Sequence, residues 1–153
     1  MMTQKRILSK VRDVFRVPLG DGTHAYGHVL GSTLQGFYAV RTDKDVAIDS
    51  LVNEAVAFRV QGMKDRIEKG DWPVVGNIEP SDAMNAPIRF GQEKSPGFFL
   101  LYEWSPSTGG DTRRASADEV KGLECDVLWD STFVLERLKM YFRGVPCPYV
   151  KLV

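Results

Sequence analysis

Apolar and polar residues alternate through the first forty positions of the chain in a way that predicts three short β-strands. Every second residue from Val11 to Leu19 falls on one face of an extended segment, and Gly-Asp-Gly at 20–22 follows it. Asp-Gly suits a tight turn because glycine accepts positive φ, so we predict a hairpin with a return strand over 24–30. A second turn leads to a third strand over 36–40. Short strands joined by tight turns indicate a strongly bent, partly barrel-like antiparallel sheet.

The middle of the chain predicts further short elements separated by loops. Val56, Phe58 and Val60 alternate with more polar residues, as a strand requires, and Gly70 is a natural helix stop. Three prolines within 79–97 favour irregular structure. In chain order, we expect a loop over 41–53, a strand over 56–60, a short helix over 63–69, an extended segment over 72–78 and a long surface loop over 79–97.

Two further strands are predicted in the last third of the chain. Residues 98–104 form its most apolar stretch and indicate a central strand buried on both faces. Apolar residues then recur at every second position over 123–129, as in a half-buried strand, with Glu124, Asp126 and Leu128 on the other side.

The same third of the chain predicts two helices. Ser116 and Glu119 have the spacing of a capping box, so a short helix begins there and ends near Gly122. The clearest helix of the chain follows Asp130 or Ser131, either of which can cap it, and carries apolar residues at i, i+4 and i+7.

These elements amount to an α+β fold with about seven short strands and two or three short helices, the longest at the C-terminus. The 153 residues fit a single domain over 1–153, and 43% hydrophobic with 26% charged residues is ordinary globular composition. No apolar run approaches the roughly 20 residues that cross a bilayer, and 1–10 lack the apolar core of a signal peptide. We therefore expect a cytoplasmic protein with no membrane partner.

The net charge is zero, which argues against a general nucleic-acid binder. The charge is nevertheless uneven, since 1–16 hold five basic residues against one acidic, and 111–136 hold seven carboxylates against three basic residues. An acidic patch in the second segment could meet and steer a basic protein partner. The candidate binding residues of this patch are Asp118, Glu119, Glu124, Asp126 and Asp130.

No set of catalytic or metal-binding residues emerges from the sequence. His24 and His28, the only histidines, fall on one face of the predicted hairpin, and we expect that face to be in solvent. A zinc site needs three or four protein ligands, which two histidines do not supply. The chain has no Gly-x-Ser-x-Gly elbow and no glycine-rich phosphate loop. We expect no cofactor and no metal, and a structural or merely tolerated role for Cys125 and Cys147 in a reducing compartment.

Several motifs resemble the immunity protein 26 family, whose members are predicted antitoxins of bacterial polymorphic toxin systems. The resemblance begins at the first hairpin, spans most of the chain and is weaker around 122–124 and in the last helix. The motifs are KVRDVF at 10–15, VPL at 17–19, DG at 21–22, YGHVL at 26–30, GFY at 36–38, VAFRV at 56–60 and GDWPVVGN at 70–77.

The resemblance implies a non-catalytic cytoplasmic protein that protects its producer by binding a toxin domain. It would either block the toxin's active site or hold the toxin inactive. The matching residues look structural, and no binding residue is carried over, because the toxin-contacting surface is expected to vary between members. The family pattern usually has glycine immediately before the aspartate of the first strand, where this chain has Arg12, and this departure concerns a local bend.

Two other functions remain open at this point. A small β-barrel that binds nucleic acid or a ligand in a regulatory role would use the basic opening, which includes Lys5, Arg6, Lys10, Arg12 and Arg16. An enzyme would have its best acid/base pair in Glu124 and Asp126, near Trp129.

Overall fold

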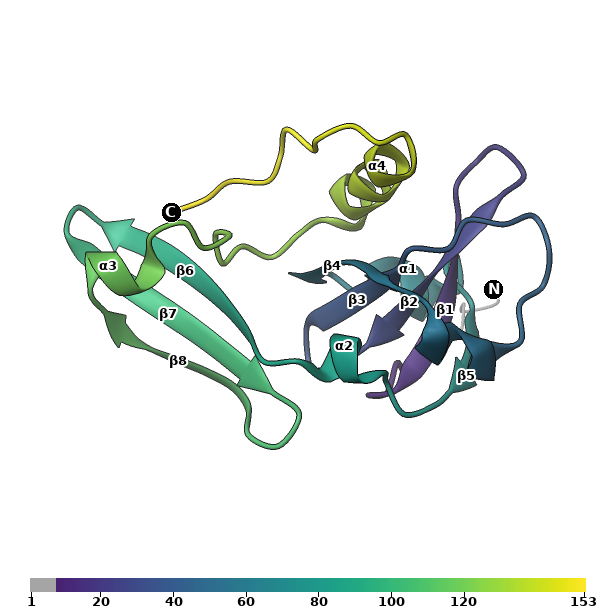
Figure 1. Ribbon diagram of the computed structural model, residues 1–153, viewed down its shortest axis with the longest axis horizontal. Helices are drawn as coiled ribbons and strands as arrows, with labels where there is room; N and C mark the ends of the chain where they lie inside the picture. Colours follow the sequence, from purple (N-terminus) through teal and green to yellow (C-terminus); the bar gives the residue numbers. More distant parts are fainter. Residues whose placement is uncertain (1–7) are drawn as a thin grey trace, which may run out of the picture.

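A computed structural model describes residues 8–153 and confirms the α+β class, with eight strands in two antiparallel sheets and five short helices (Figure 1). The sheets are not closed into a barrel. Lys5 and Arg6 of the basic opening lie outside the described residues. The elements are β1 (Asp13–Pro18), β2 (His24–Val29), β3 (Leu34–Tyr38), η1 (Ile48–Asn53), β4 (Val56–Gln61), α1 (Asp65–Lys69), β5 (Val74–Asn77), α2 (Asp82–Asn85), β6 (Ile88–Ser95), β7 (Phe98–Ser105), β8 (Gly109–Ala115), α3 (Ala117–Val120) and α4 (Ser131–Phe142).

The first sheet has the strand order β4-β3-β2-β1-β5 and contains the predicted hairpin. Phe15 of β1 lies opposite Gly27 of β2, which lies opposite Phe37 of β3. The Phe15 ring occupies the space above Gly27 that a Cβ would need, and it stacks on Trp72 with ring centroids 5.9 Å apart. Glycine at position 27 therefore allows the aromatic centre of the sheet to form.

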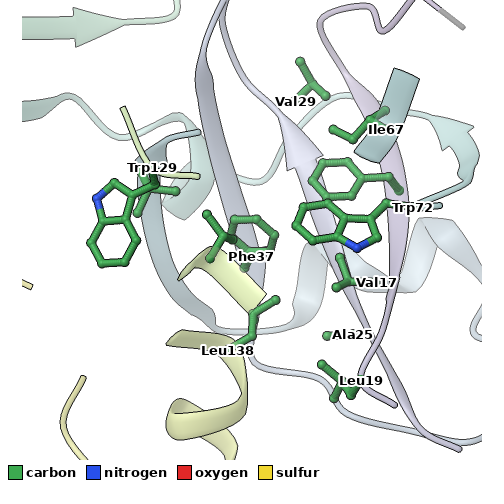
Figure 2. Packing of buried hydrophobic residues seen from close by; sticks show 12 residues of the cluster. Val17, Leu19, Ala25, Val29, Phe37, Ile67, Trp72, Trp129 and Leu138 are labelled. Atoms are coloured by element: carbon green, nitrogen blue, oxygen red, sulfur yellow. The ribbon is translucent and has the colours of Figure 1, made fainter. Parts of the chain in front are cut away.

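Both faces of this sheet are buried. On one face, which we call the first core, Phe15, Val17 and Phe37 pack under α1, Trp72, Trp129 and α4 (Figure 2). On the other face, the second core, apolar residues of the same strands pack against Leu51 of η1, Met84 of α2 and two residues of the second sheet, Phe90 and Trp104. The two sheets thus share the second core.

The second sheet has the order β6-β7-β8 and departs from the sequence prediction. The expected loop over 79–97 is wrong, because Ser81 caps α2 through the Met84 N–H and β6 pairs with β7 along its length. β8 carries no apolar alternation and is almost wholly exposed, so periodicity gave no sign of it. The prediction that β7 is buried on both faces is also wrong, since only Leu101 and Trp104 of that strand are fully buried.

The predicted strand over 123–129 is a connecting segment that bonds to two different sheet edges. Cys125 forms an isolated parallel bridge with Gly91 of β6, and Trp129 forms one with Gly62 at the end of β4. Because its partner changes from one sheet to the other, the segment never pairs over enough consecutive residues to count as a strand. It instead joins the open edges of both sheets.

The structure confirms the helix caps predicted from the sequence and shows how the chain bends before β1. Ser116 and Glu119 form the predicted capping box at α3, and Asp130 caps α4 by accepting from the Thr132 N–H. Arg12 has a φ of 80°, so the bend exists without the glycine that usually provides it.

Among residues 8–153, no helix is both long and apolar enough to cross a bilayer.

Candidate functional site

The 123–130 segment meets the C-terminal residues between the second sheet and α4 (Figure 1). The Cys125 N–H donates to the Lys151 carbonyl, and the Val153 N–H donates to the Leu123 carbonyl. An isolated antiparallel bridge joins Glu124 to Leu152. This junction positions most of the carboxylates predicted to form an acidic patch.

Glu124 is held inside this junction by Arg137 of α4. Arg137 donates to both carboxylate oxygens, at 2.7 and 3.2 Å, and both side chains are largely buried. The guanidinium also lies over the rings of Phe58 and Trp129, 4.3 and 5.0 Å from their centroids. A carboxylate bound in this way is unsuited to act as one half of the acid/base pair considered for Glu124 and Asp126.

Glu119 is also engaged within the chain. It accepts from the Ser116 N–H in the capping box and from Arg113 at 2.7 Å. These hydrogen bonds, the one from Arg113 foremost, lower the pKa of Glu119 to about 2. Asp118 next to it is exposed, so α3 offers one open carboxylate and one that is already paired.

Asp126 and Asp130 flank three apolar residues of the segment. The Asp126 carboxyl is half-buried, burial raises its pKa, and the described residues give its side chain no hydrogen-bond or ion-pair partner. Asp130 is exposed, and one carboxylate oxygen accepts from the Thr132 N–H at 2.8 Å. Of the five predicted patch residues, Asp118, Asp126 and Asp130 thus remain available to a partner.

An apolar groove of about 330 Å³ lies between the 127–130 segment, α4 and the C-terminal residues. Sequence reasoning missed this feature, although Leu128 gave a signal by placing an apolar side chain on the polar side of the predicted strand. Leu128 is 56% exposed, Phe133 45% and Tyr149 44%. The lining residues are Val127, Leu128, Trp129, Asp130, Phe133, Pro148, Tyr149 and Lys151.

The histidine prediction is wrong for His28, which is fully buried. Its Nε2 lies 3.0 Å from the carbonyl oxygens of both Arg12 and Ile78, and its Nδ1 lies 2.6 Å from the Tyr38 hydroxyl. Because carbonyls only accept, Nε2 carries the hydrogen and Nδ1 accepts from Tyr38. Burial lowers the pKa of His28 and raises that of Tyr38 to about 12, so His28 is a neutral structural residue.

The other candidates for chemistry are a metal site, the two cysteines and a hollow with charged walls. Within residues 8–153 no group of three or more metal-ligating side chains comes together. Cys125 and Cys147 are free and half-buried. The charged residues that line a hollow of about 480 Å³ beside the β1–β2 turn are Asp21, Arg41, Glu136, Lys139 and Arg143. Asp21 pairs with Arg41, and Glu136 with Lys139.

Two of the three basic residues of the opening that the structure describes, Arg12 and Arg16, lie beside acidic neighbours. Arg12 lies 2.8 Å from Glu79, and Arg16 lies 3.7 Å from Asp45. These contacts partly neutralise the positive charge on which the nucleic-acid hypothesis depended.

Comparison with protein-family models shows which family the chain belongs to. A family model described as immunity protein 26 matches residues 12–99, which span the first sheet, α2, β6 and the start of β7. The match covers more than half of the chain, so the chain belongs to the immunity protein 26 family. No curated protein and no solved structure matches it significantly. The family supports a general immunity function, and the resemblance seen in the motifs is confirmed.

Proposed function

We propose that this chain is an immunity protein that binds a polymorphic toxin domain in the cytoplasm of the producing bacterium and neutralises it without catalysis. The observation that carries the proposal is the family match over residues 12–99. We further propose that residues 1–153 act as a single domain. Two features support this, because the two sheets share the second core and the 123–130 segment bonds to an edge strand of each.

Neutralisation by binding requires a surface, and the chain offers one with suitable properties. A specific protein interface buries about 800 Å² on each partner and depends on a few large apolar or arginine anchors. The exposed apolar residues of the 127–152 region can supply such anchors. Asp118, Asp126 and Asp130 can face a basic toxin surface and raise the association rate, whereas Glu119 and Glu124 stabilise the fold.

The alternative functions lack a supporting observation. A nucleic-acid-binding barrel would need an unpaired basic surface, while Arg12 and Arg16 lie beside carboxylates. An enzyme built on Glu124 would need a carboxylate free to exchange a proton, and this one is fixed by Arg137. Toxin binding is therefore the function we put forward.

Co-expression tests the proposal directly. The gene adjacent to this chain's own would be expressed in a bacterial host alone and together with this chain, and growth would be followed. We expect the neighbouring product to arrest growth and co-expression to restore it. If no neighbouring product is toxic, or if co-expression leaves toxicity unchanged, the proposed function is wrong.

A further inference from the structure

We infer that the apolar groove between the 127–130 segment, α4 and the C-terminal residues is where the toxin docks. The docked segment is one that carries a large apolar side chain next to a lysine or arginine. This inference rests on the proposed function and adds the surface and the chemistry of the partner. The apolar side chain would enter the groove beside Leu128, Phe133 and Tyr149. The basic residue would face Asp126 and Asp130.

The first argument is where exposed apolar residues gather. Among the described residues, seven of the eleven large hydrophobic side chains that are exposed lie within 127–152. That region is entirely outside the 12–99 range shared with the family model. Four of these seven residues line the groove, and a contiguous exposed apolar area is a mark of an interaction site. Its position outside the matched range fits a function that differs between members, which recognition of one particular toxin is.

The second argument is that the groove is formed before any partner arrives. Phe133 and Tyr149 contact each other edge to face, with ring centroids 4.8 Å apart. Trp129 packs in the first core, and the Arg137 guanidinium lies over its ring. A preformed site avoids the entropic cost of ordering side chains on binding, so its apolar surface contributes fully to affinity.

The third argument is the negative charge beside the groove, which favours a partner that carries a basic residue. The wall formed by 127–130 carries the Asp130 carboxylate, and Asp126 immediately precedes this wall in the chain. The Asp126 carboxyl is half-buried without a partner in the described chain. A partly desolvated carboxylate gains from a lysine or arginine brought to it. Lys151, on the C-terminal wall, is the one basic residue among the described residues that line the groove. We therefore expect the partner's basic residue on the 126–130 side.

The test uses the neighbouring toxin domain identified by co-expression, and measures its binding to purified variants of the full chain. Leu128→Lys places a bulky cation in the groove at an exposed position, so the fold should tolerate it. Val52→Lys is the matched control, because Val52 is also an exposed apolar residue, on η1, which covers the opposite face of the first sheet. We expect Leu128→Lys to raise Kd at least about 30-fold and to lose protection, while Val52→Lys stays within about twofold of the unmodified chain.

A separate variant tests whether the partner's basic residue binds beside Asp126 and Asp130. Asparagine caps helices as well as aspartate does, so Asp126→Asn with Asp130→Asn removes two charges and keeps the α4 cap. We expect the association rate to fall about tenfold at low salt and to depend less on salt concentration. An unchanged rate and salt dependence would overturn the basic-partner assignment.

The outcomes separate the inference from the proposed function. If the unmodified chain neutralises the toxin and Leu128→Lys does so equally well, the docking site is wrong while the proposed function stands. If the unmodified chain neutralises no neighbour, the proposed function itself fails. Sedimentation analysis covers a second copy as occupant: a dimer that Leu128→Lys dissociates without weakening toxin binding would overturn the inference. Matching thermal unfolding midpoints of Leu128→Lys and the unmodified chain would exclude misfolding as the cause of lost binding.

Discussion

Arg137 of α4 and Glu124 of the connecting segment form an ion pair with two hydrogen bonds, of 2.7 and 3.2 Å, and the Arg137 guanidinium lies over the rings of Phe58 and Trp129. This pair is one of the side-chain links between the 123–130 segment and the final helix. The segment in turn bonds to an edge strand of each sheet. The ion pair therefore stabilises the wall of the apolar groove as well as the junction of the sheets.

The first prediction concerns this ion pair. Arg137→Met leaves a largely buried Glu124 carboxylate without its partner, so we expect the free energy of unfolding to fall by about 2–3 kcal/mol. Arg137→Met combined with Glu124→Leu removes both charges, and we expect it to recover at least about half of that loss. Urea unfolding of the two single variants and the double variant measures both values. Additive losses would show that the pair does not couple.

The second prediction concerns the bend before β1. Arg12 has a φ of 80°, which costs a non-glycine residue about 1–2 kcal/mol. Its carbonyl accepts from the Ile78 N–H and from His28, which holds the backbone in this conformation. We expect Arg12→Gly to raise the free energy of unfolding by about 0.5–1 kcal/mol in urea unfolding, after loss of the exposed ion pair with Glu79.

Arg12→Ala is the matched control for this bend. It removes the same ion pair but keeps a Cβ at positive φ, so we expect no gain in stability. Equal effects of glycine and alanine would mean that the backbone at position 12 is not strained.

The third prediction concerns pH. Burial lowers the pKa of His28 in the folded state, whereas in the unfolded chain it titrates near its ordinary value of 6.5. Below that value the unfolded chain binds more protons than the folded chain, so stability falls as the pH falls. Its slope cannot exceed about 1.4 kcal/mol per pH unit for one group. We expect urea midpoints to drop between pH 7.5 and 5.5.

Two histidine variants separate this effect from other titrating groups. His28→Gln should remove the drop along with some stability at pH 7.5, because the side chain bonds to two carbonyls and to Tyr38. His24→Gln is the control and should leave the drop in place, since that side chain is half-buried and, among residues 8–153, hydrogen-bonds only to Tyr26. A drop that persists in His28→Gln would assign the pH dependence to another group.

The sequence predicted well those elements whose signals are local. The hairpin of β1 and β2 follows from alternation and a Gly-Asp-Gly turn, and the caps of α3 and α4 follow from Ser116, Glu119 and Asp130. β6 and β8 were missed because their stability comes from pairing with β7, and the sequence of β8 carries no apolar face. Although β7 is their neighbour in the chain, pairing with it leaves no periodic trace in the sequences of β6 and β8.

In the candidate site, too, local features were predictable from the sequence and features that depend on the fold were not. The sequence indicated that residues 111–136 are rich in carboxylates, but only the fold decides which of them are engaged. Arg137 lies thirteen residues beyond Glu124 and reaches it because α4 packs back on the segment. The apolar groove was not predicted at all, because Tyr149 and Phe133 face each other through a chain reversal that no local pattern specifies.

The last prediction concerns Gly27, where β2 passes under the Phe15 ring. A Cβ at this position would overlap ring carbons of Phe15, which stacks on Trp72 and meets Phe37 edge to face. In a close-packed core that overlap forces the ring out of its place, so we expect Gly27→Ala to lower the free energy of unfolding by about 2–3 kcal/mol.

Phe15→Leu combined with Gly27→Ala tests the cause. The smaller side chain leaves room for the added methyl group, so we expect the double variant to be less destabilised than the sum of the two single variants by about 1 kcal/mol or more in urea unfolding. Val17→Ala combined with Gly27→Ala is the matched control. Val17 lies in the same core, but it is not among the nearest contacts of that Cβ. Simple additivity in both pairs would show that the requirement for glycine at position 27 does not come from the Phe15 ring.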